Sequence, residues 1–351
     1  MFRENVKMNI AVIVPSRKKA GPVIVAADQI KLLSERGHSC KLFYLDDGPD
    51  EVQFVCPAEK ISLRTSVDFS AYDVVHCHGL RPCFYITRHK PLCCKTAFVT
   101  TLHSYIFRDF CCTYGKLKGI AGALVYLCLL LRFDKIITLS RDALRYYKRL
   151  LFFKRFDFLY NTVDPVLNKL PEEQYQKLMN FKQEAVLLGI NAVLSRGKGQ
   201  QLVLSALPEL PGCKLFLLGS GPNEASLRAL AEKLGVADRV CFAGFRKNAV
   251  DYLPYYDLFI LPTYSEGCPL ALLEAAASGK KIVCSNIPVL EEMFRESPVV
   301  FFDINHPETL APAIQKALAE EEVREKMNCC FEEKFSKEAV AEKLLQIYES
   351  C

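Results

Sequence analysis

The sequence predicts an α/β protein built from two doubly wound, Rossmann-like domains. Its 351 residues are more than one ordinary hydrophobic core accommodates, which favours two domains. Half of the residues are hydrophobic, enough to build two large cores. Short strand-like apolar runs alternate with amphipathic helical stretches, and the alternation starts twice along the chain. Such alternation predicts parallel sheets that are covered by helices on both faces.

The first domain is expected over residues 8–165 and begins with a buried strand. An apolar run over Ile10–Val14 precedes a helical pattern over Ile24–Arg36, with Gly37 as its stop. Four further strands are predicted at Cys40–Tyr44, Val74–His76, Ala97–Leu102 and Lys135–Leu139.

The second domain is expected over residues 183–330, after a linker around Asp164–Asn180. Its predicted strands are Ala185–Leu188, Lys214–Leu218, Val240–Phe242, Leu258–Leu261 and Lys281–Cys284. Its predicted helices are Gln200–Leu207, Asn223–Leu234 and Thr309–Glu321. A final helix over residues 336–351 carries an apolar face, so it must pack on another element.

Charge and cysteine content narrow the class of protein. The formal net charge is +5, a mild excess that does not indicate nucleic-acid binding. The 16 cysteines show neither a Cys-x-x-Cys motif nor zinc-type spacing. Reduced thiols and a cytoplasmic compartment are therefore expected.

Two apolar runs raise the question of a membrane segment. The run Met8–Pro15 is too short for a signal peptide and lacks a small-residue cleavage site, so it predicts a buried strand. The longest run, Gly119–Leu131, is shorter than the ~20 residues that span a bilayer. It predicts a buried or interfacial helix.

The stretch Leu258–Gly279 is the most informative part of the chain. It predicts a buried strand, a polar loop that carries Glu266, and a helix that Pro269 opens and Gly279 ends. Such a turn directs unpaired N–H groups and a positive dipole end at one point, which suits a phosphate. Glu266, and Glu274 in the helix, are carboxylates that can bind sugar hydroxyls. The geometry therefore suggests a nucleotide-sugar site.

A second candidate loop, Ser195–Gly199, contains Arg196 and Lys198 just before a predicted helix. Two cations at a helix start can clamp a diphosphate. A solvated basic loop is the alternative.

The two glutamates belong to the string Ser-Glu-Gly-x-Pro-Leu-x-Leu-Leu-Glu-Ala-x-Ala-x-Gly-Lys, which begins at Ser265. This string resembles the motif that binds the nucleotide-sugar in retaining glycosyltransferases of the GT4 family, which have the GT-B fold. The resemblance covers nearly the whole chain from Met8, and it is strong in the second half and diffuse in the first. It implies transfer from a nucleotide-diphosphate sugar across a cleft between two domains. It also implies that the final helix, residues 336–351, packs back on the first domain.

The resemblance assigns roles to the second-domain residues. Glu274 would bind the ribose hydroxyls and Glu266 the transferred sugar, while Lys198 matches the family lysine that binds the diphosphate. Arg196 would replace a family arginine that normally follows a glycine, where this chain has Gly189-Ile190.

Other positions of the nucleotide-sugar site follow from the same resemblance. The Gly219-Ser-Gly221-Pro turn is similar to a family turn near the nucleotide, and Phe245 would line the base unless it is a core residue. The remaining expected contacts are Gly267, Leu270 and Cys268, the last of which stands where the family usually has an aromatic residue.

The acceptor side is expected in the first domain. His103 ends a predicted strand, where the family often has a histidine close to the transferred sugar, and it joins Glu266 and Lys198 as a catalytic candidate. Gly21 and Arg17 lie in the loop after the first strand, and its cations could bind an anionic acceptor or simply face solvent. His76 and His78 point the same way on a strand, but two ligands without a third do not make a metal site. No metal or cofactor is expected.

The expected function is the transfer of a hexose or N-acetylhexosamine, with UDP as the expected carrier. The acceptor would be a glycan or lipid-linked molecule in cell-surface polysaccharide or lipopolysaccharide synthesis. A GT-B nucleotide-sugar epimerase or hydrolase is one alternative, and an inactive nucleotide-sugar-binding partner of a transferase complex is another.

A basic, aromatic segment also indicates a membrane partner. Arg141–Phe158 interleaves cations with Tyr, Phe and Leu, and Tyr105–Tyr114 adds aromatic residues. Such surfaces suit an anionic membrane. A domain helix with a basic face is the alternative. Peripheral contact with the inner face of the plasma membrane is therefore expected.

Overall fold

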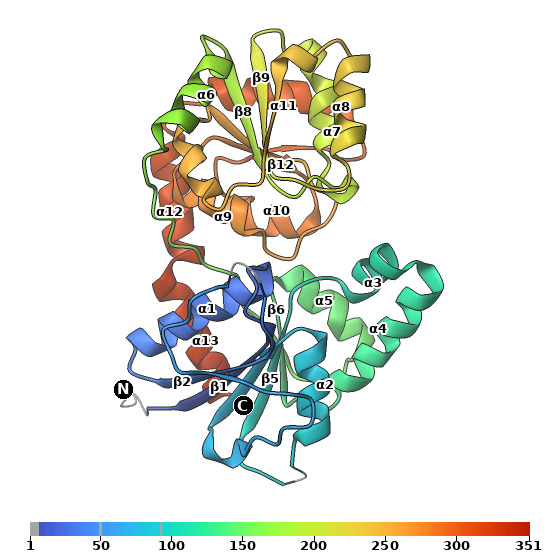
Figure 1. Cartoon of the computed structure of the whole chain (residues 1–351), viewed down its shortest axis with the longest axis vertical. Helices are drawn as coiled ribbons and strands as arrows, with labels where there is room; N and C mark the ends of the chain where they lie inside the picture. Colours follow the sequence, from blue (N-terminus) through green and yellow to red (C-terminus); the bar gives the residue numbers. More distant parts are fainter. Residues whose placement is uncertain (1–6, 49–50, 92) are drawn as a thin grey trace. The chain divides into compact units, whose positions relative to one another are not determined.

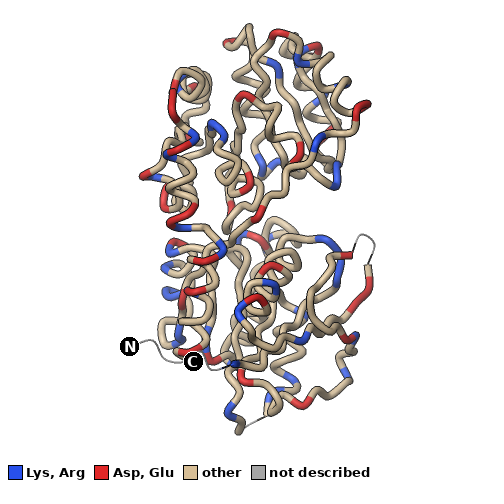
Figure 2. Tube along the Cα trace, turned by 90° about the vertical axis from the view of Figure 1, so that its left-hand side faces the viewer, with Lys and Arg blue, Asp and Glu red and all other residues tan. Residues whose placement is uncertain are grey.

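A computed structural model describes residues 7–48, 51–91 and 93–351 of the chain. They form two compact units (Figure 1), one that runs to Thr162 and adds Lys337–Cys351, and one that comprises Val163–Ser336. Lys, Arg, Asp and Glu are interspersed over both units (Figure 2). Within the described ranges, no helix combines the length and hydropathy needed to cross a membrane. All 16 cysteines are free thiols.

The first unit contains a seven-stranded sheet in which every pairing is parallel. Its strands lie in the order β3 (Ala58–Lys60), β2 (Ser39–Asp46), β1 (Asn9–Ser16), β4 (Val74–His78), β5 (Ala97–Leu102), β6 (Lys135–Thr138) and β7 (Phe156–Phe158). The chain winds one way from β1 to β3 and then returns to β4, which pairs with the other side of β1. The strand order therefore reverses between β1 and β4.

Helices cover both faces of this sheet. They are α1 (Gly21–Glu35), α2 (Leu80–His89), α3 (Ile106–Tyr114), α4 (Lys116–Leu130), α5 (Arg141–Leu150) and α13 (Lys337–Glu349). Successive strand residues point to opposite faces: Ile13 belongs to the core under α2, α4 and α5, whereas Val12 belongs to the core under α1 and α13. Val340 and Leu344 of α13 are buried in that second core, so the final helix completes the first unit.

The second unit repeats the plan with six parallel strands. Their order is β10 (Val240–Gly244), β9 (Cys213–Leu218), β8 (Val186–Asn191), β11 (Leu258–Leu261), β12 (Ile282–Ser285) and β13 (Val300–Phe302). Its helices are α6 (Glu172–Lys182), α7 (Gln200–Ala206), α8 (Glu224–Lys233), α9 (Leu270–Ala277), α10 (Pro288–Phe294), α11 (Leu310–Ala319) and α12 (Val323–Phe335). Here the strand order reverses between β8 and β11.

The structure confirms each predicted strand, with ends shifted by at most three residues. Three short strands were not predicted: β3, β7 and β13. The linker expected around Asp164–Asn180 is wrong in its second half, where α6 begins. Glu172 and Glu173 in the first turn of α6 and Lys182 in its last turn complement the helix dipole, a charge pattern that could have indicated this helix.

Candidate active site

Both units reverse their strand order, and in open parallel sheets the loops beyond such a point diverge and leave a ligand crevice. In the second unit the loops after β8 and β11 lie on either side of this reversal. These loops are tied together, because the Tyr264 N–H donates to the Gly197 carbonyl at 3.0 Å and the Thr263 hydroxyl donates to the same oxygen at 3.2 Å. The two segments predicted to bind the nucleotide-sugar are therefore neighbours.

Gly199 makes this close approach possible. Its φ is +70°, and a Cβ at this position would lie 1.8 Å from the Pro262 carbonyl oxygen. Any side chain would push the loops apart, so the glycine of Ser195–Gly199 is required by backbone packing.

Lys198 and Glu266 meet between the two loops. Lys198 ends the 3₁₀ turn Arg196–Lys198, and its Nζ lies 2.5 Å from Glu266 Oε1. The Glu266 side chain is 10% exposed and that of Lys198 is 30% exposed, so both are largely shielded yet accessible. A shielded ion pair at a strand-order reversal presents both a cation for phosphate and a carboxylate for sugar hydroxyls. Arg196 is exposed on the same turn.

The glycine-rich turn after β9 packs against the loop after β8. A Cβ at Gly219 would lie 2.0 Å from the Ala192 carbonyl oxygen, and one at Gly221 would lie 2.3 Å from that of Leu194. The Gly219 N–H also donates to the carbonyl of Gly244 at the end of β10, at 3.0 Å. The loops after three adjacent strands are thus held at one edge of the sheet. These contacts explain both glycines, and a nucleotide contact stays a prediction.

Phe245 follows β10 at this same edge and is 60% exposed. The alternative that it is a core phenylalanine is therefore wrong. Ile190, by contrast, is 1% exposed within β8, so the family's arginine position is occupied here by a buried apolar side chain.

Helix α9 carries the second glutamate. Pro269 has extended backbone (φ −73°, ψ 116°) and is the N-cap, so the helix begins at Leu270 and not at the proline itself. Gly279 follows the last turn with φ +63°, as predicted. Glu274 is half-buried in the second turn, and Cys268 is buried just before the helix. Gly267, like Leu270, is half-buried.

The first unit has a cavity of about 250 Å³. Its walls include Pro22 and Gly79 beside the strand-order reversal, and His103 at the end of β5. The structure therefore places His103 in a pocket. Gly21, next to Pro22, begins α1 and has open space around it. Arg17 does not line this cavity, because its guanidinium pairs with Glu51 and lies 4.8 Å from the centre of the Tyr44 ring.

His103 is the outer end of a buried chain of imidazoles. Its Nε2 lies 3.0 Å from His78 Nδ1, and His78 stacks near His76 with 4.5 Å between ring centres. His76 bonds to the Thr101 hydroxyl through Nε2 and to the Tyr348 hydroxyl through Nδ1, both at 2.8 Å. Tyr348 comes from α13, so the last helix of the chain buttresses this site.

These histidines are neutral at physiological pH. Burial lowers the pKa of His76 to about 3, with a smaller contribution from His103, and burial also lowers the pKa of His103 to about 4. His103 therefore acts as a neutral hydrogen-bonding group and not as a cation. Across the described parts of the chain, no cluster of three His, Cys, Asp or Glu side chains could hold a metal ion.

The cavity also contains residues that the sequence did not mark as acceptor candidates. Asp109, Phe110 and Tyr114 of α3 line it. The sequence assigned the aromatic residues of this segment to a membrane surface. Two glycines in the sequence, Gly115 and Gly119, could have indicated the tight packing of this segment. Gly115 turns the chain sharply with a φ of +80°, and a Cβ at Gly119 would lie 2.6 Å from the Cys111 backbone. Together they fold α3 tightly onto α4 beside the strand ends.

Two doubly wound units, one with a Lys–Glu pair at its reversal, define the GT-B architecture. Sucrose-phosphate synthase from Thermosynechococcus elongatus matches with a TM-score of 0.79 and 18% identity, over 98% of this chain and 99% of that chain. Alr3699/HepE from Anabaena, solved in complex with UDP, matches with a TM-score of 0.79 and 18% identity, over 98% of this chain and 100% of that chain. These likenesses confirm the GT-B fold.

Sequence comparison gives the family. The model of "Glycosyl transferases group 1" matches residues 172–329. The chain is 30% identical to the O-antigen biosynthesis glycosyltransferase WclY of Escherichia coli. The alignment spans 357 residues and covers 98% of each chain. It is also 30% identical to the lipopolysaccharide core biosynthesis glycosyltransferase LpsE of Rhizobium meliloti, over 44% of this chain and 46% of that protein. The chain belongs to the group 1 glycosyltransferases, and it is a glycosyltransferase.

Proposed function

We propose that this enzyme transfers a hexose or N-acetylhexosamine from a UDP-sugar to a glycan or lipid-linked acceptor of lipopolysaccharide or O-antigen synthesis, with retention at the anomeric carbon. The observation that carries the proposal is the Lys198–Glu266 pair at the strand-order reversal of the second unit. The named O-antigen and lipopolysaccharide-core relatives support the acceptor class. The UDP in the matching Anabaena structure supports a uridine carrier.

In the proposed reaction the bond between the anomeric carbon and the diphosphate oxygen breaks, and the acceptor hydroxyl oxygen bonds to that carbon. The hydroxyl proton leaves with the diphosphate. Lys198 and Arg196 would neutralise the departing diphosphate, and Glu266 would stabilise positive charge that develops on the sugar. A preorganised group of this kind typically contributes about 3 kcal/mol to the transition state.

The ion pair itself indicates how the site is loaded. Lys198 and Glu266 neutralise each other at 2.5 Å in a shielded place, where an unpaired charge would be unfavourable. The diphosphate supplies a new partner for Lys198, and the sugar hydroxyls supply partners for Glu266. Glu274 on α9 would hold the ribose hydroxyls, and neutral His103 would hydrogen-bond a sugar hydroxyl.

A thermal-shift screen across UDP-sugars and GDP-mannose tests this assignment. Lys198→Ala and Glu274→Ala are expected to weaken nucleotide-sugar binding about 100-fold, the equivalent of about 3 kcal/mol. Lys233→Ala, an exposed change at the end of α8, is the matched control and should leave binding unchanged. Unchanged affinity in both site variants would remove the assignment.

The same material separates the other two functions. Turnover of the nucleotide-sugar without any acceptor would favour an epimerase or hydrolase. Binding without turnover against a broad acceptor panel would favour an inactive partner.

We also propose that the first unit contacts an anionic membrane, through an α4 strip of exposed apolar residues. Its members, with their exposed fractions, are Leu117 (86%), Ile120 (45%), Leu124 (52%), Val125 (59%) and Leu131 (47%). From Gly115 to Phe133 the chain contains Lys116, Lys118 and Arg132 but no acidic residue. An apolar face flanked only by cations matches an anionic lipid surface.

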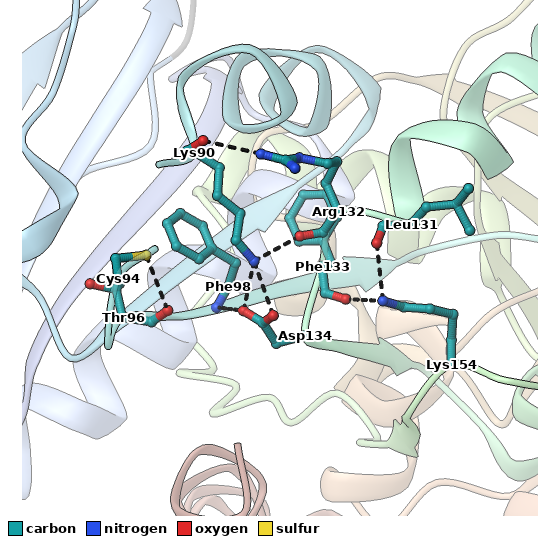
Figure 3. A network of polar contacts seen from close by, with 9 residues as sticks. All are labelled: Lys90, Cys94, Thr96, Phe98, Leu131, Arg132, Phe133, Asp134 and Lys154. Atoms are coloured by element: carbon teal, nitrogen blue, oxygen red, sulfur yellow. Dashed lines mark hydrogen bonds and ion pairs between the residues drawn. The ribbon is translucent and has the colours of Figure 1, made fainter. Parts of the chain in front are cut away.

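The strip continues into the turn after α5, where Phe152 is 82% exposed and Phe153 is 62% exposed. Figure 3 shows why the two parts adjoin: Lys154 Nζ donates to the Leu131 carbonyl at 3.2 Å and also to that of Phe133. In the same network Lys90 Nζ, at the end of α2, binds the Asp134 carboxylate at 2.9 Å, which ties α2 to the segment between α4 and β6.

This surface differs from the one that the sequence predicted. In Arg141–Phe158 most of the apolar bulk faces inward, because Tyr147 and Leu151 are buried in the core. Only the turn at Phe152 and Phe153 presents large apolar side chains to solvent from that segment. The proposed contact therefore centres on α4.

Flotation with phosphatidylglycerol vesicles tests the contact. The chain is expected to float at low salt, and Leu117→Glu with Leu124→Glu should lower the bound fraction at least 10-fold, since burying each leucine contributes roughly 2 kcal/mol. Val55→Glu changes another exposed apolar residue of the same unit and is the control. Equal flotation of all three proteins, or none of the native chain, would contradict the proposal.

A further inference from the structure

The cavity of the first unit has a chemistry that specifies its ligand. We infer that it binds the acceptor as a single uncharged pyranose ring. The inference rests on the proposed transferase function, and it narrows the acceptor class from any glycan or lipid-linked anion to a neutral sugar terminus.

Charge is the first argument. Among the residues that line the cavity, all of them in the described part of the chain, Asp109 alone carries a formal charge. His103 is neutral because burial lowers its pKa to about 4. Arg17, the cation expected to serve an anionic acceptor, is paired with Glu51 elsewhere. A phosphate or carboxylate in this cavity would therefore face a carboxylate, with no cation among the lining residues to attract it.

The polar groups form a set that matches hydroxyls. Asp109 Oδ2 accepts a hydrogen bond from the Ser104 hydroxyl at 3.1 Å, and a carboxylate retains capacity for further donors. His103 engages His78 through Nε2, so Nδ1 is the nitrogen that can meet a ligand hydroxyl. The loop that carries His103 and Ser104 is braced, because the Tyr147 hydroxyl donates to the Ser104 carbonyl at 2.6 Å and accepts from the Ile106 N–H at 3.0 Å.

An aromatic wall completes the cavity. The Phe110 ring lies 5.7 Å from that of Tyr114 and 6.1 Å from that of Tyr126, and all three line the space. Aromatic rings provide a rigid apolar surface for the C–H face of a sugar ring, while the hydroxyls point to the polar groups. Asp109 is exposed and His103 is half-buried, so a ligand hydroxyl can reach both side chains.

Size limits the ligand to one ring. The volume of about 250 Å³ lies below the roughly 300–1,000 Å³ of sites for drug-sized ligands. Tyr114 is 60% exposed at the rim, so the remainder of a longer acceptor would continue outside. Tyr126 lines the cavity from α4, while its neighbour Val125 belongs to the exposed α4 strip. The cavity therefore lies on the inner side of the helix proposed to touch lipid, which suits the sugar end of a lipid-linked acceptor.

Saturation-transfer NMR with the full chain tests the cavity directly. The probes are the methyl pyranosides of glucose, galactose, mannose and N-acetylglucosamine, with methyl glucuronide and glucose 6-phosphate as the anionic counterparts. At least one neutral pyranoside is expected to receive saturation, and the anionic sugars are not. Tyr114→Ala and Asp109→Asn should each weaken the neutral ligand at least 10-fold.

Asp109→Asn should change the binding of neutral and of anionic sugars in opposite directions. Removing the carboxylate should raise binding of the anionic sugars relative to the native chain. Arg108→Gln, next to Asp109 on α3 but outside the cavity lining, is the control and should change nothing.

Three results would overturn the inference: no saturation from any neutral pyranoside, tighter binding of the anionic sugars by the native chain, or variants that bind as the native chain does. Failure of the nucleotide-sugar screen is a separate outcome. It would contradict the proposed transfer reaction while the saturation experiment still reports on the cavity alone.

Discussion

The two units share a plan but differ in the chemistry at their strand-order reversals. At the reversal of the second unit an opposed pair of charges, Lys198 and Glu266, is 2.5 Å apart. At the reversal of the first unit a neutral histidine, aromatic rings and one carboxylate surround a small cavity. The strand-order reversal thus determines where each candidate site lies, and the side chains of the adjoining loops determine its charge. Cations favour phosphate, whereas a sugar hydroxyl needs none, so we propose that the two places bind different ligands.

The loops also differ in how tightly their backbones are packed. In the second unit, a Cβ at Gly199, Gly219 or Gly221 would collide with a carbonyl group of a neighbouring loop. In the first unit, Gly21 has open space around it. The loops of the second unit are therefore predicted to tolerate much less change.

The largest expected effect is that of Gly199→Ala. The new Cβ would overlap the Pro262 carbonyl and the residue would keep a left-handed φ, which together cost about 3 kcal/mol or more. For a unit of this size the melting temperature should fall by about 6 °C or more, and nucleotide-sugar binding should weaken. Gly197→Ala, two residues earlier in open space, is the matched control. Equal melting temperatures for the two variants would break the comparison.

The buried histidines make the first unit sensitive to acid. The pKa of His76 is about 3 in the folded chain and near 6.5 when unfolded, so the unfolded chain binds more protons between these values. The stabilisation is complete above pH 6.5 and is lost as the pH falls toward 3. At pH 5 the loss from His76 is about 2 kcal/mol relative to pH 7.

Urea unfolding at pH 7 and pH 5 measures this loss. His76→Gln should reduce the difference between the two pH values by about 2 kcal/mol. His306→Gln, an exposed histidine of the second unit, should leave it unchanged. The same acid sensitivity in all three proteins would show that His76 is not the source.

The smallest expected effect is that of Gly21→Ala. Alanine fits the first residue of α1 without a clash, and it reduces the entropy of the unfolded chain, so stability should rise by roughly 0.4–1 kcal/mol. Gly79→Ala in the same unit should do the reverse, because its φ of +94° strains any side chain. Denaturation midpoints distinguish the two, and a loss of stability in Gly21→Ala would contradict the open-loop description.

The sequence was sufficient for the fold and for most of the loops that form the candidate site of the second unit, for a physical reason. Alternating apolar periods report parallel sheets, and the Glu266–Glu274 string lies in one continuous strand-loop-helix segment. Lys198 belongs to a separate segment, and only the family resemblance assigned it to the same site as Glu266. The structure brings the two side chains together, because β8 and β11 are neighbouring strands.

The cavity of the first unit was beyond sequence reasoning because its walls come from distant segments. Pro22, His103, Asp109 and Tyr126 belong to different elements, and no local spacing connects them. The sequence assigned the aromatic residues of Tyr105–Tyr114 to a membrane surface and the run Gly119–Leu131 to a buried or interfacial helix. The structure places Tyr114 and Tyr126 at the cavity, and Leu117 and Leu124 in the outer strip. For Arg17 the sequence showed only a basic loop. In the structure the Arg17 guanidinium forms an ion pair with Glu51, a residue that the sequence does not connect with it.

Two-substrate kinetics of Glu274→Ala and Asp109→Asn, measured side by side, test the central proposal most directly. That proposal is that the second unit binds the nucleotide-sugar and the first unit binds the acceptor. Glu274→Ala should raise the KM for the nucleotide-sugar at least 10-fold and leave the KM for a neutral acceptor within about twofold. Asp109→Asn should do the opposite. If each variant raised both KM values equally, or if the two effects were exchanged, the assignment of the nucleotide-sugar to the second unit and of the acceptor to the first would be contradicted.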